Sequence, residues 1–153
     1  MKLEVGDKIP SFTLTDREGN LFSSQQIVGK KVLVIYFYPK NFTPGCTKEA
    51  CSFRDNYKQF KELGAEVIGI SSDSVESHQK FTQKYDLPYI LLSDPTEDIR
   101  QEFGVKGHLF RLIPGRETFV VDKQGKVRFK FNSLSATHHM EKALETVKKI
   151  TDE

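Results

Sequence analysis

The chain has 153 residues, with 23 basic and 21 acidic side chains, a formal net charge of +2, and 37% hydrophobic residues. This length predicts one domain, residues 1–153, with a substantial core. The balanced charge argues against a nucleic-acid partner recruited by bulk charge. No stretch approaches the ~20 apolar residues of a membrane span, and residues 1–7 contain no apolar signal region. We therefore expect a cytoplasmic protein with no membrane partner.

The first half of the chain predicts a hairpin, a buried strand and a helix in turn. Short apolar segments flank the turn sequence of residues 16–20, which predicts a small hairpin. The unbroken apolar run of residues 32–38 predicts a strand buried on both faces. Two prolines and a glycine then indicate a loop over residues 39–45. A helix follows, with apolar side chains at three- or four-residue spacing: Ala50, Phe53, Tyr57, Phe60 and Leu63.

The middle of the chain alternates strands and helices. Residues 66–70 and 88–92 predict two further strands. The sequence of residues 73–76 resembles a capping box, with Asp73 as the N-cap of a helix. Asp94, followed by Pro95 and a glutamate, predicts a second helix start, and that helix is expected to end near residue 104.

The C-terminal part predicts a hairpin and a last helix. The hairpin strands are expected at residues 118–122 and 126–131, and the helix begins near Thr137. Strands that alternate with helices, followed by a late hairpin, indicate an α/β fold. We expect a mixed sheet with helices on both sides.

Both cysteines follow the central strand. Cys46 lies where that strand passes into the N-terminus of a helix, whose unpaired N–H groups and dipole favour a thiolate over a thiol. The thiolate is the nucleophilic form. Thr43 places a hydroxyl close to the sulfur, able to donate or accept a hydrogen bond. The alternative is that Cys46 is a small buried hydrophobic side chain at a helix start.

Cys51 changes the balance between these alternatives. It lies five residues beyond Cys46 and about 140° around the same predicted helix, on the polar side, while Cys46 faces inward. In an intact helix the two Cα atoms are about 8–9 Å apart, beyond the limit of about 7 Å for a disulfide. A disulfide therefore requires the first turn to unwind. This favours a reactive cysteine with a resolving partner over a structural disulfide.

The sequence around the cysteines resembles the peroxiredoxin active-site signature Pro-x-x-x-Thr-x-x-Cys, met here by Pro39, Thr43 and Cys46. The run from Thr43 to Cys51 is similar to the bacterioferritin-comigratory-protein/peroxiredoxin Q subgroup, in which a second cysteine follows five residues on. Further segments extend the resemblance over nearly the whole chain: residues 5–12, 53–55, 69–73, 92–94 and 114–122. It implies a thioredoxin-like fold with the peroxiredoxin N-terminal extension and a central mixed β-sheet flanked by helices.

The resemblance also implies a thiol-dependent peroxidase. The Cys46 thiolate would attack hydrogen peroxide or an organic hydroperoxide and become a sulfenic acid. Cys51 would resolve it as an intramolecular disulfide, which thioredoxin or a similar thiol reductant reduces. By the same resemblance Arg116 supplies the cation beside the sulfur, since arginine stays charged and offers a fork of donors. Thr43 would hold the peroxide through its hydroxyl, and Pro39 would shield the sulfur from water.

Other residues receive no catalytic role. We expect no metal or organic cofactor, because the histidines lack ligand spacing. His78 is expected at the edge of the core, and His139 is not expected to form a site. Glu49, one helical turn after Cys46, is expected to have a structural role around the motif. Residues 107–114 resemble the plant and cyanobacterial Q type and are expected to line the substrate entrance, and a monomer is expected because no C-terminal cysteine arm follows the last helix.

Two other functions remain open. A thiol–disulfide oxidoreductase on the same fold would carry C-x-x-C, whereas four residues separate these cysteines. A non-enzymatic redox sensor would form its disulfide slowly and would show no turnover with a reductant.

Overall fold

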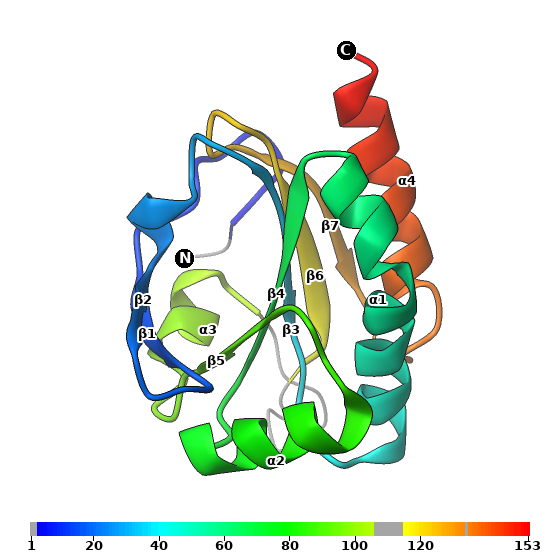
Figure 1. The fold of residues 1–153 in the computed structure, drawn as a ribbon. Helices are drawn as coiled ribbons and strands as arrows, with labels where there is room; N and C mark the ends of the chain where they lie inside the picture. Colours follow the sequence, from blue (N-terminus) through cyan, green and yellow to red (C-terminus); the bar gives the residue numbers. More distant parts are fainter. Residues whose placement is uncertain (1–2, 106–114, 134) are drawn as a thin grey trace.

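The computed structural model describes residues 3–105, 115–133 and 135–153 (Figure 1). Across these ranges the strands form one seven-stranded mixed sheet in the order β2-β1-β5-β4-β3-β6-β7. The strands are β1 (Thr13–Asp16), β2 (Leu21–Ser23), β3 (Val32–Phe37), β4 (Ala65–Ser71), β5 (Ile90–Ser93), β6 (Glu117–Val121) and β7 (Val127–Asn132). The helices are the 3-10 turn η1 (Ser24–Gln26), α1 (Pro44–Glu62), α2 (Val75–Tyr85), α3 (Asp98–Glu102) and α4 (His139–Thr151). The predicted α/β architecture with a mixed sheet between helices is confirmed.

Strand β3 is the centre of the fold. It runs parallel to β4 and antiparallel to β6, with Val34 opposite Val67 on one side and Val120 on the other. All six of its residues are buried. Because side chains alternate across a strand, Val34 and Tyr36 enter one core cluster while their neighbours enter the other. The unbroken apolar run is therefore explained by burial on both faces of the sheet.

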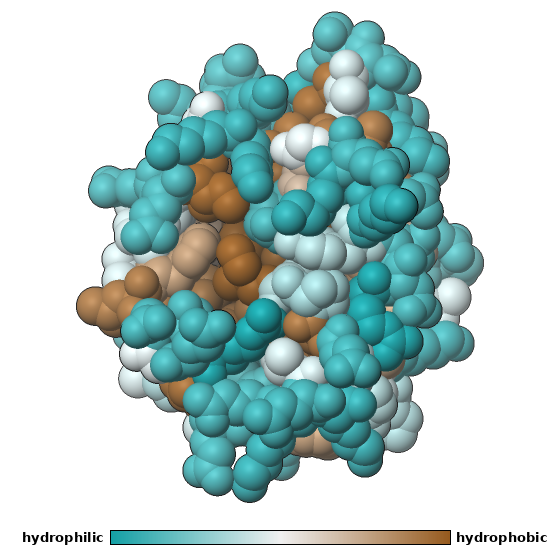
Figure 2. Space-filling view, viewed as in Figure 1, coloured by the Kyte–Doolittle hydropathy of each residue, from teal (hydrophilic) through white to brown (hydrophobic). Residues whose placement is uncertain are grey.

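The two faces of the sheet carry different helices (Figure 1). Helices α1 and α4 pack together on one face, where Phe53, Phe60 and Val147 join the first core cluster. Helix α3 and the N-terminal segment cover the other face through Ile99 and Phe12. The face drawn in Figure 2 is mainly hydrophilic, and its hydrophobic side chains gather between β1 and β4. In the part of the chain that the structure describes, no helix is both long enough and apolar enough to cross a membrane.

Two helices begin later than predicted. Helix α3 begins at Asp98, and Glu97 occupies the N-cap with a left-handed φ of 62°. The chain first makes a turn, in which the Glu97 N–H donates to the Asp94 carbonyl. Asp94 nevertheless accepts from the backbone N–H of Arg100 at 3.0 Å, so its carboxylate still satisfies the N-terminus of α3. Helix α4 begins at His139, two residues beyond the predicted start.

The N-cap of α2 is displaced by one residue from the prediction. Ser74, rather than Asp73, caps the helix, and its hydroxyl accepts from the Ser77 N–H at 3.1 Å. The Asp73 carboxylate instead accepts from the backbone N–H of Asn41 and from the Ser71 hydroxyl. The tertiary contact of Asp73 with the loop before α1 therefore replaces the local capping interaction.

Candidate active site

The loop that follows β3 places Cys46 in the first turn of α1, beyond the carboxyl end of that strand. Thr43 is the N-cap of α1, Pro44 is its first residue, and Cys46 is its third. A cysteine at this position meets the unpaired N–H groups of the first turn, as predicted. Its side chain is buried, with 1% of its surface exposed. Both cysteines are free thiols in one continuous helix.

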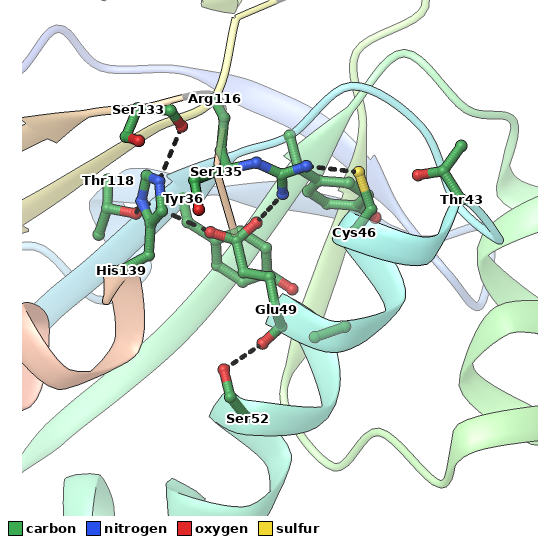
Figure 3. A network of polar contacts seen from close by, with 12 residues as sticks. Tyr36, Thr43, Cys46, Glu49, Ser52, Arg116, Thr118, Ser133, Ser135 and His139 are labelled. Atoms are coloured by element: carbon green, nitrogen blue, oxygen red, sulfur yellow. Dashed lines mark hydrogen bonds and ion pairs between the residues drawn. The ribbon is translucent and has the colours of Figure 1, made fainter. Parts of the chain in front are cut away.

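Arg116 lies against this sulfur (Figure 3). Its Nη2 donates to Cys46 Sγ at 3.3 Å, and its Nη1 donates to Glu49 Oε1 at 2.5 Å. The arginine directly precedes β6, which pairs with β3, so sheet pairing carries it to the start of α1. A Cβ on Gly45 would lie 3.2 Å from Arg116 Nη2. Glycine at position 45 therefore leaves the space in which the guanidinium reaches the sulfur.

Glu49 accepts a hydrogen bond from the second terminal nitrogen of Arg116, Nη1. Its side chain is fully buried. Burial raises the pKa of Glu49 to about 7, even though Arg116 opposes that shift. The expected structural role of Glu49 was an incomplete description, because its carboxylate is the direct ionic partner of Arg116. Its spacing of one helical turn from Cys46 was the signal that could have identified this contact.

His139 completes this buried network, which sequence reasoning missed. Its Nδ1 lies 2.8 Å from Thr118 Oγ1 and 3.5 Å from Glu49 Oε2, and its Nε2 lies 3.0 Å from the Ser133 carbonyl oxygen (Figure 3). Burial lowers the pKa of His139 to about 4. No local pattern distinguishes His139 from its neighbour His138. Only the packing of α4 against α1 and β6 brings it to Glu49.

Thr43 and Pro39 lie in the loop before α1, and both are half-buried. The Thr43 hydroxyl donates to the Lys40 carbonyl at 2.8 Å and makes no capping bond to α1. Because its hydrogen is engaged, the Thr43 oxygen is left to accept a hydrogen bond. Pro39 follows β3 by two residues.

Cys51 lies on the more exposed side of α1, as predicted, and is half-buried. Burial raises the pKa of its thiol above the ordinary value, while Arg54 opposes the shift. Cys51 is therefore held as a thiol rather than a thiolate. Because α1 is unbroken from Pro44 to Glu62, bringing the two sulfurs together requires the first turns to unwind.

A second polar network, also missed, anchors the loop. Asn41 is buried, and its side chain accepts from the Tyr38 hydroxyl at 2.6 Å and binds Ser77 Oγ and His78 Nδ1. His78 is fully buried rather than at the edge of the core, and its Nε2 lies 3.1 Å from the Leu92 carbonyl. Polar partners on both sides of the ring make this burial tolerable. The loop is therefore tied to α2 and the end of β5.

Phe42 is the strained residue of this loop. Its φ is +66°, in the left-handed region that side-chain-bearing residues rarely adopt. The ring is 45% exposed and packs edge-on against Phe81, with centroids 5.1 Å apart. Strain held in place by surrounding contacts is common at functional sites.

The described residues contain no group of three or more His, Cys, Asp or Glu side chains that could hold a metal ion. What the arrangement offers is a buried thiol at a helix N-terminus with a guanidinium in contact. Such a setting stabilises a thiolate and can also stabilise negative charge that develops on an attacked oxygen. Residues 107–114, expected at the substrate entrance, lie outside the described residues.

Comparison with known proteins places this geometry in context. A protein-family model described as the AhpC/TSA family matches residues 5–130. The chain is 48% identical over 150 residues to chloroplastic peroxiredoxin Q of Sedum lineare, covering 97% of this chain and 80% of the relative. It is 52% identical over 132 residues to chloroplastic peroxiredoxin Q of Suaeda salsa, covering 86% of this chain and 61% of that relative.

The similar solved structures are also those of peroxiredoxins. Peroxidoxin BcpB from Mycobacterium tuberculosis has a TM-score of 0.89 at 40% identity and covers 97% of this chain and 98% of its own. A cysteine-to-serine mutant of PrxQ from Xylella fastidiosa also has a TM-score of 0.89, at 26% identity, with the same coverage. These likenesses confirm the predicted thioredoxin-like peroxiredoxin fold.

The predicted cytoplasmic location is contradicted, because the names of the similar peroxiredoxins Q place those proteins in the chloroplast. That prediction depended on the lack of an apolar signal region. Transit peptides of organelles are amphipathic and rich in arginine and serine rather than apolar. The feature used was therefore unable to separate the cytoplasm from an organelle.

Proposed function

The chain belongs to the AhpC/TSA family and is a thiol-dependent peroxidase like the peroxiredoxins Q, and on this premise we propose that Cys46 is its peroxidatic cysteine. The observation that carries the proposal is the hydrogen bond from Arg116 Nη2 to Cys46 Sγ at the N-terminus of α1. A cation and helix N–H groups at one sulfur favour the nucleophilic thiolate.

In the proposed reaction the Cys46 thiolate attacks the terminal oxygen of the peroxide. An S–O bond forms, the O–O bond breaks, and the sulfur becomes a sulfenic acid. The second oxygen leaves as hydroxide or alkoxide and takes a proton from water. Negative charge moves from sulfur to oxygen along the line of attack, and the Arg116 guanidinium lies beside that line to stabilise it.

We assign the positioning of the peroxide to Thr43 and Pro39. The Thr43 hydroxyl donates to the Lys40 carbonyl, so its oxygen can accept the hydrogen of the bound peroxide. That contact would direct the terminal oxygen towards Cys46. Pro39, half-buried at the start of the same loop, would keep water from the sulfur.

Cys51 is proposed as the resolving cysteine. After the first turns of α1 unwind, its thiol displaces the hydroxyl of the Cys46 sulfenic acid, which forms a disulfide and releases water. A dithiol reductant such as thioredoxin then reduces the disulfide by thiol–disulfide exchange. Because both cysteines belong to one helix, the cycle needs no cysteine from another subunit, and we expect a monomer to suffice.

The test is a single turnover followed by intact-mass measurement. Reduced protein is mixed with an equimolar amount of hydrogen peroxide, quenched within a second and mapped at its cysteines. We expect loss of two hydrogens in the wild type, a gain of one oxygen in Cys51→Ser, and no change in Cys46→Ser. An unreactive wild type would show that Cys46 is not an activated thiolate and would overturn the proposal.

Two further assays on the same protein distinguish the peroxidase from the two other functions. A thiol–disulfide oxidoreductase would reduce the disulfides of insulin rapidly without any peroxide. A redox sensor would form the Cys46–Cys51 disulfide slowly and would not consume peroxide repeatedly when thioredoxin and its reductase are supplied. Sustained peroxide consumption together with slow insulin reduction supports the peroxidase.

A further inference from the structure

The tautomer of His139 follows from its two neighbours. Its ring is fully buried, and Nε2 faces the Ser133 carbonyl oxygen at 3.0 Å. A carbonyl oxygen only accepts hydrogen bonds, so Nε2 carries the hydrogen. In the neutral ring Nδ1 is then an acceptor, and the Thr118 hydroxyl donates to it at 2.8 Å.

Glu49 presents a second acceptor to the same nitrogen. Its Oε1 accepts from Arg116, while its Oε2 lies 3.5 Å from His139 Nδ1. Within the described residues Oε2 is buried and has no hydrogen-bond partner. Two lone pairs that face each other in a buried site are unfavourable. One proton placed between Oε2 and Nδ1 removes the conflict, whichever atom holds it.

We propose that Glu49 and His139 share one exchangeable proton, and that His139 is a positioning residue that acts on Cys46 through Glu49 and Arg116. With the proton, the Glu49–His139 pair is neutral and does not offset the positive charge that Arg116 presents to the sulfur. Without it, the pair carries one negative charge that offsets Arg116. The protonation state of the pair thus sets how much of the Arg116 charge acts on the sulfur, and we call the pair a charge switch. This inference rests on the proposed roles of Cys46 and Arg116.

Within the part of the chain that the structure describes, few other ionisable groups lie close enough to Glu49 to exchange this proton. Among the described residues, the ionisable groups that face Glu49 come from four further places in the fold and from its own helix: Tyr36, Cys46, Tyr89, Arg116 and His139. Burial raises the pKa of Tyr36 and of Tyr89 well above the neutral range, so both hydroxyls stay protonated. With pKa values of about 7 for Glu49 and about 4 for His139, the shared proton rests on Glu49 at neutral pH.

The switch has a direct consequence for the peroxide reaction. As the pH rises through about 7 the pair loses its proton, and part of the charge that Arg116 offers to the sulfur is cancelled. The rate constant per thiolate should therefore decline through this range. Glu49→Gln keeps the neutral form at every pH, so in this variant the decline should be absent.

The first experiment measures the proton without measuring activity. Infrared spectra of the reduced protein are recorded across the pH range in a Cys46→Ser background, and the carboxylic-acid band of Glu49 is identified by its loss in Glu49→Gln. We expect this band to titrate near pH 7. Failure of peroxidase activity leaves the measurement unaffected, so it distinguishes failure of the proposed function from failure of the switch.

Two variants shift the midpoint in opposite directions. His139→Phe removes the acceptor that holds the proton on Oε2. An aromatic ring suits the site because the His139 ring packs edge-on against Phe131, with ring centroids 4.7 Å apart. The Glu49 band should then titrate at least about half a pH unit lower. Thr118→Val has nearly the same shape but no longer competes for Nδ1, so the midpoint should rise. A merely structural role of His139 predicts no such opposition.

The proposal would be overturned by the absence of a carboxylic-acid band assignable to Glu49 near neutral pH, where the shared proton is expected on that residue, or by shifts of the same sign in His139→Phe and Thr118→Val. If His139→Phe does not fold, the upward shift in Thr118→Val decides the matter alone. A pH–rate profile of Cys46 oxidation by hydrogen peroxide is then measured in the wild type and in Glu49→Gln. It tests whether the charge of the Glu49–His139 pair changes the reactivity of Cys46, and identical profiles would contradict that effect.

Discussion

Arg100 Nη2 donates to the carbonyl oxygen of Tyr38 across 2.7 Å, which fastens α3 to the start of the loop that carries Cys46. Its Nη1 donates to the Gly115 carbonyl at 2.6 Å, directly before Arg116. The guanidinium is buried, with 6% of the side chain exposed. One buried cation therefore joins the two chain segments that bring Cys46 and Arg116 together.

Replacing Arg100 with methionine should affect both stability and rate. Two buried carbonyls lose their donor, which should lower the free energy of unfolding by about 3 kcal/mol. Because the Cys46 loop and Arg116 lose their common anchor, the rate constant for Cys46 oxidation by hydrogen peroxide should fall at least about tenfold. Urea unfolding and stopped-flow oxidation measure the two effects.

Arg17 offers a matched control for this prediction. It also donates to two backbone carbonyls, those of Leu87 and Tyr89, but it holds neither segment of the site. Arg17→Met should lower stability and leave the rate of Cys46 oxidation unchanged. Equal loss of rate in both variants would mean that Arg100 acts only through general stability.

Sequence patterns predicted the parts of the site that depend on near neighbours. The strand before Cys46, a helix from about Cys46 and the inward direction of Cys46 were predicted from apolar periodicity within a few residues, and in the structure the helix begins two residues earlier, at Pro44. The expected start of α2 was displaced because Asp73 uses its carboxylate on the loop before α1, and α3 begins later than expected because the chain first makes a turn after Asp94. For α2, the capping motif indicated which residues can cap, and the tertiary contact of Asp73 with Asn41 decided that Ser74 does.

The second half of the site depends on contacts between distant segments. Arg116 reaches Cys46 because β6 pairs with β3, and no local property of a turn arginine indicates this. The family resemblance supplied that residue. It supplied no role for His139 or Asn41, whose burial is decided by the packing of α4 and α2. Polar residues buried by topology have no periodic signature, so sequence reasoning missed both networks.

Phe42 should slow the unwinding that resolution requires. Its ring contact with Phe81 is worth about 1 kcal/mol and is lost when the first turn of α1 opens. Phe42→Ala should therefore speed disulfide formation after the sulfenic-acid step about fivefold. Quenched-flow mass spectrometry separates this step from the initial oxidation.

A second substitution at this position isolates the backbone strain. Phe42→Gly also removes the ring, but glycine adopts a φ of +66° without the penalty that alanine incurs. The folded loop is then more stable, so Phe42→Gly should resolve more slowly than Phe42→Ala. The reverse order would show that strain at Phe42 does not promote opening.

Cys51 should protect Cys46 from over-oxidation. In Cys51→Ser the first oxidation should keep the wild-type rate, because Cys51 has no part in it, while turnover with a thioredoxin-type reductant should be lost. Excess peroxide should then convert the trapped sulfenic acid to sulfinic acid. Peptide mass mapping distinguishes these products, and sulfinic acid in the wild type after an equimolar dose of peroxide would contradict the protective role.

The shared proton also makes a prediction for stability against pH. The pKa of His139 is lowered from 6.5 to about 4, so by itself it makes the fold less stable as pH falls through 6.5. The pKa of Glu49 is raised from 4.5 to about 7, so by itself it makes the fold less stable as pH rises from 4.5 to 7. Between pH 4.5 and 6.5 the two effects oppose each other. The pair holds one proton in either state, on Glu49 when folded and on His139 when unfolded.

Replacing either Glu49 or His139 should reveal the pH-dependent contribution of the other residue to the free energy of unfolding, because in the wild type the two contributions cancel. Relative to the wild type, the free energy of unfolding of Glu49→Gln should rise with pH between 4.5 and 6.5 by up to about 1.4 kcal/mol per pH unit, because the His139 contribution is then uncompensated. In His139→Phe the slope should have the opposite sign, because only Glu49 remains. Urea unfolding at several pH values measures both slopes. Since His78 and the surface carboxylates are unchanged in all three proteins, their contributions cancel in the comparison, and parallel curves would mean that Glu49 and His139 do not exchange a proton on unfolding.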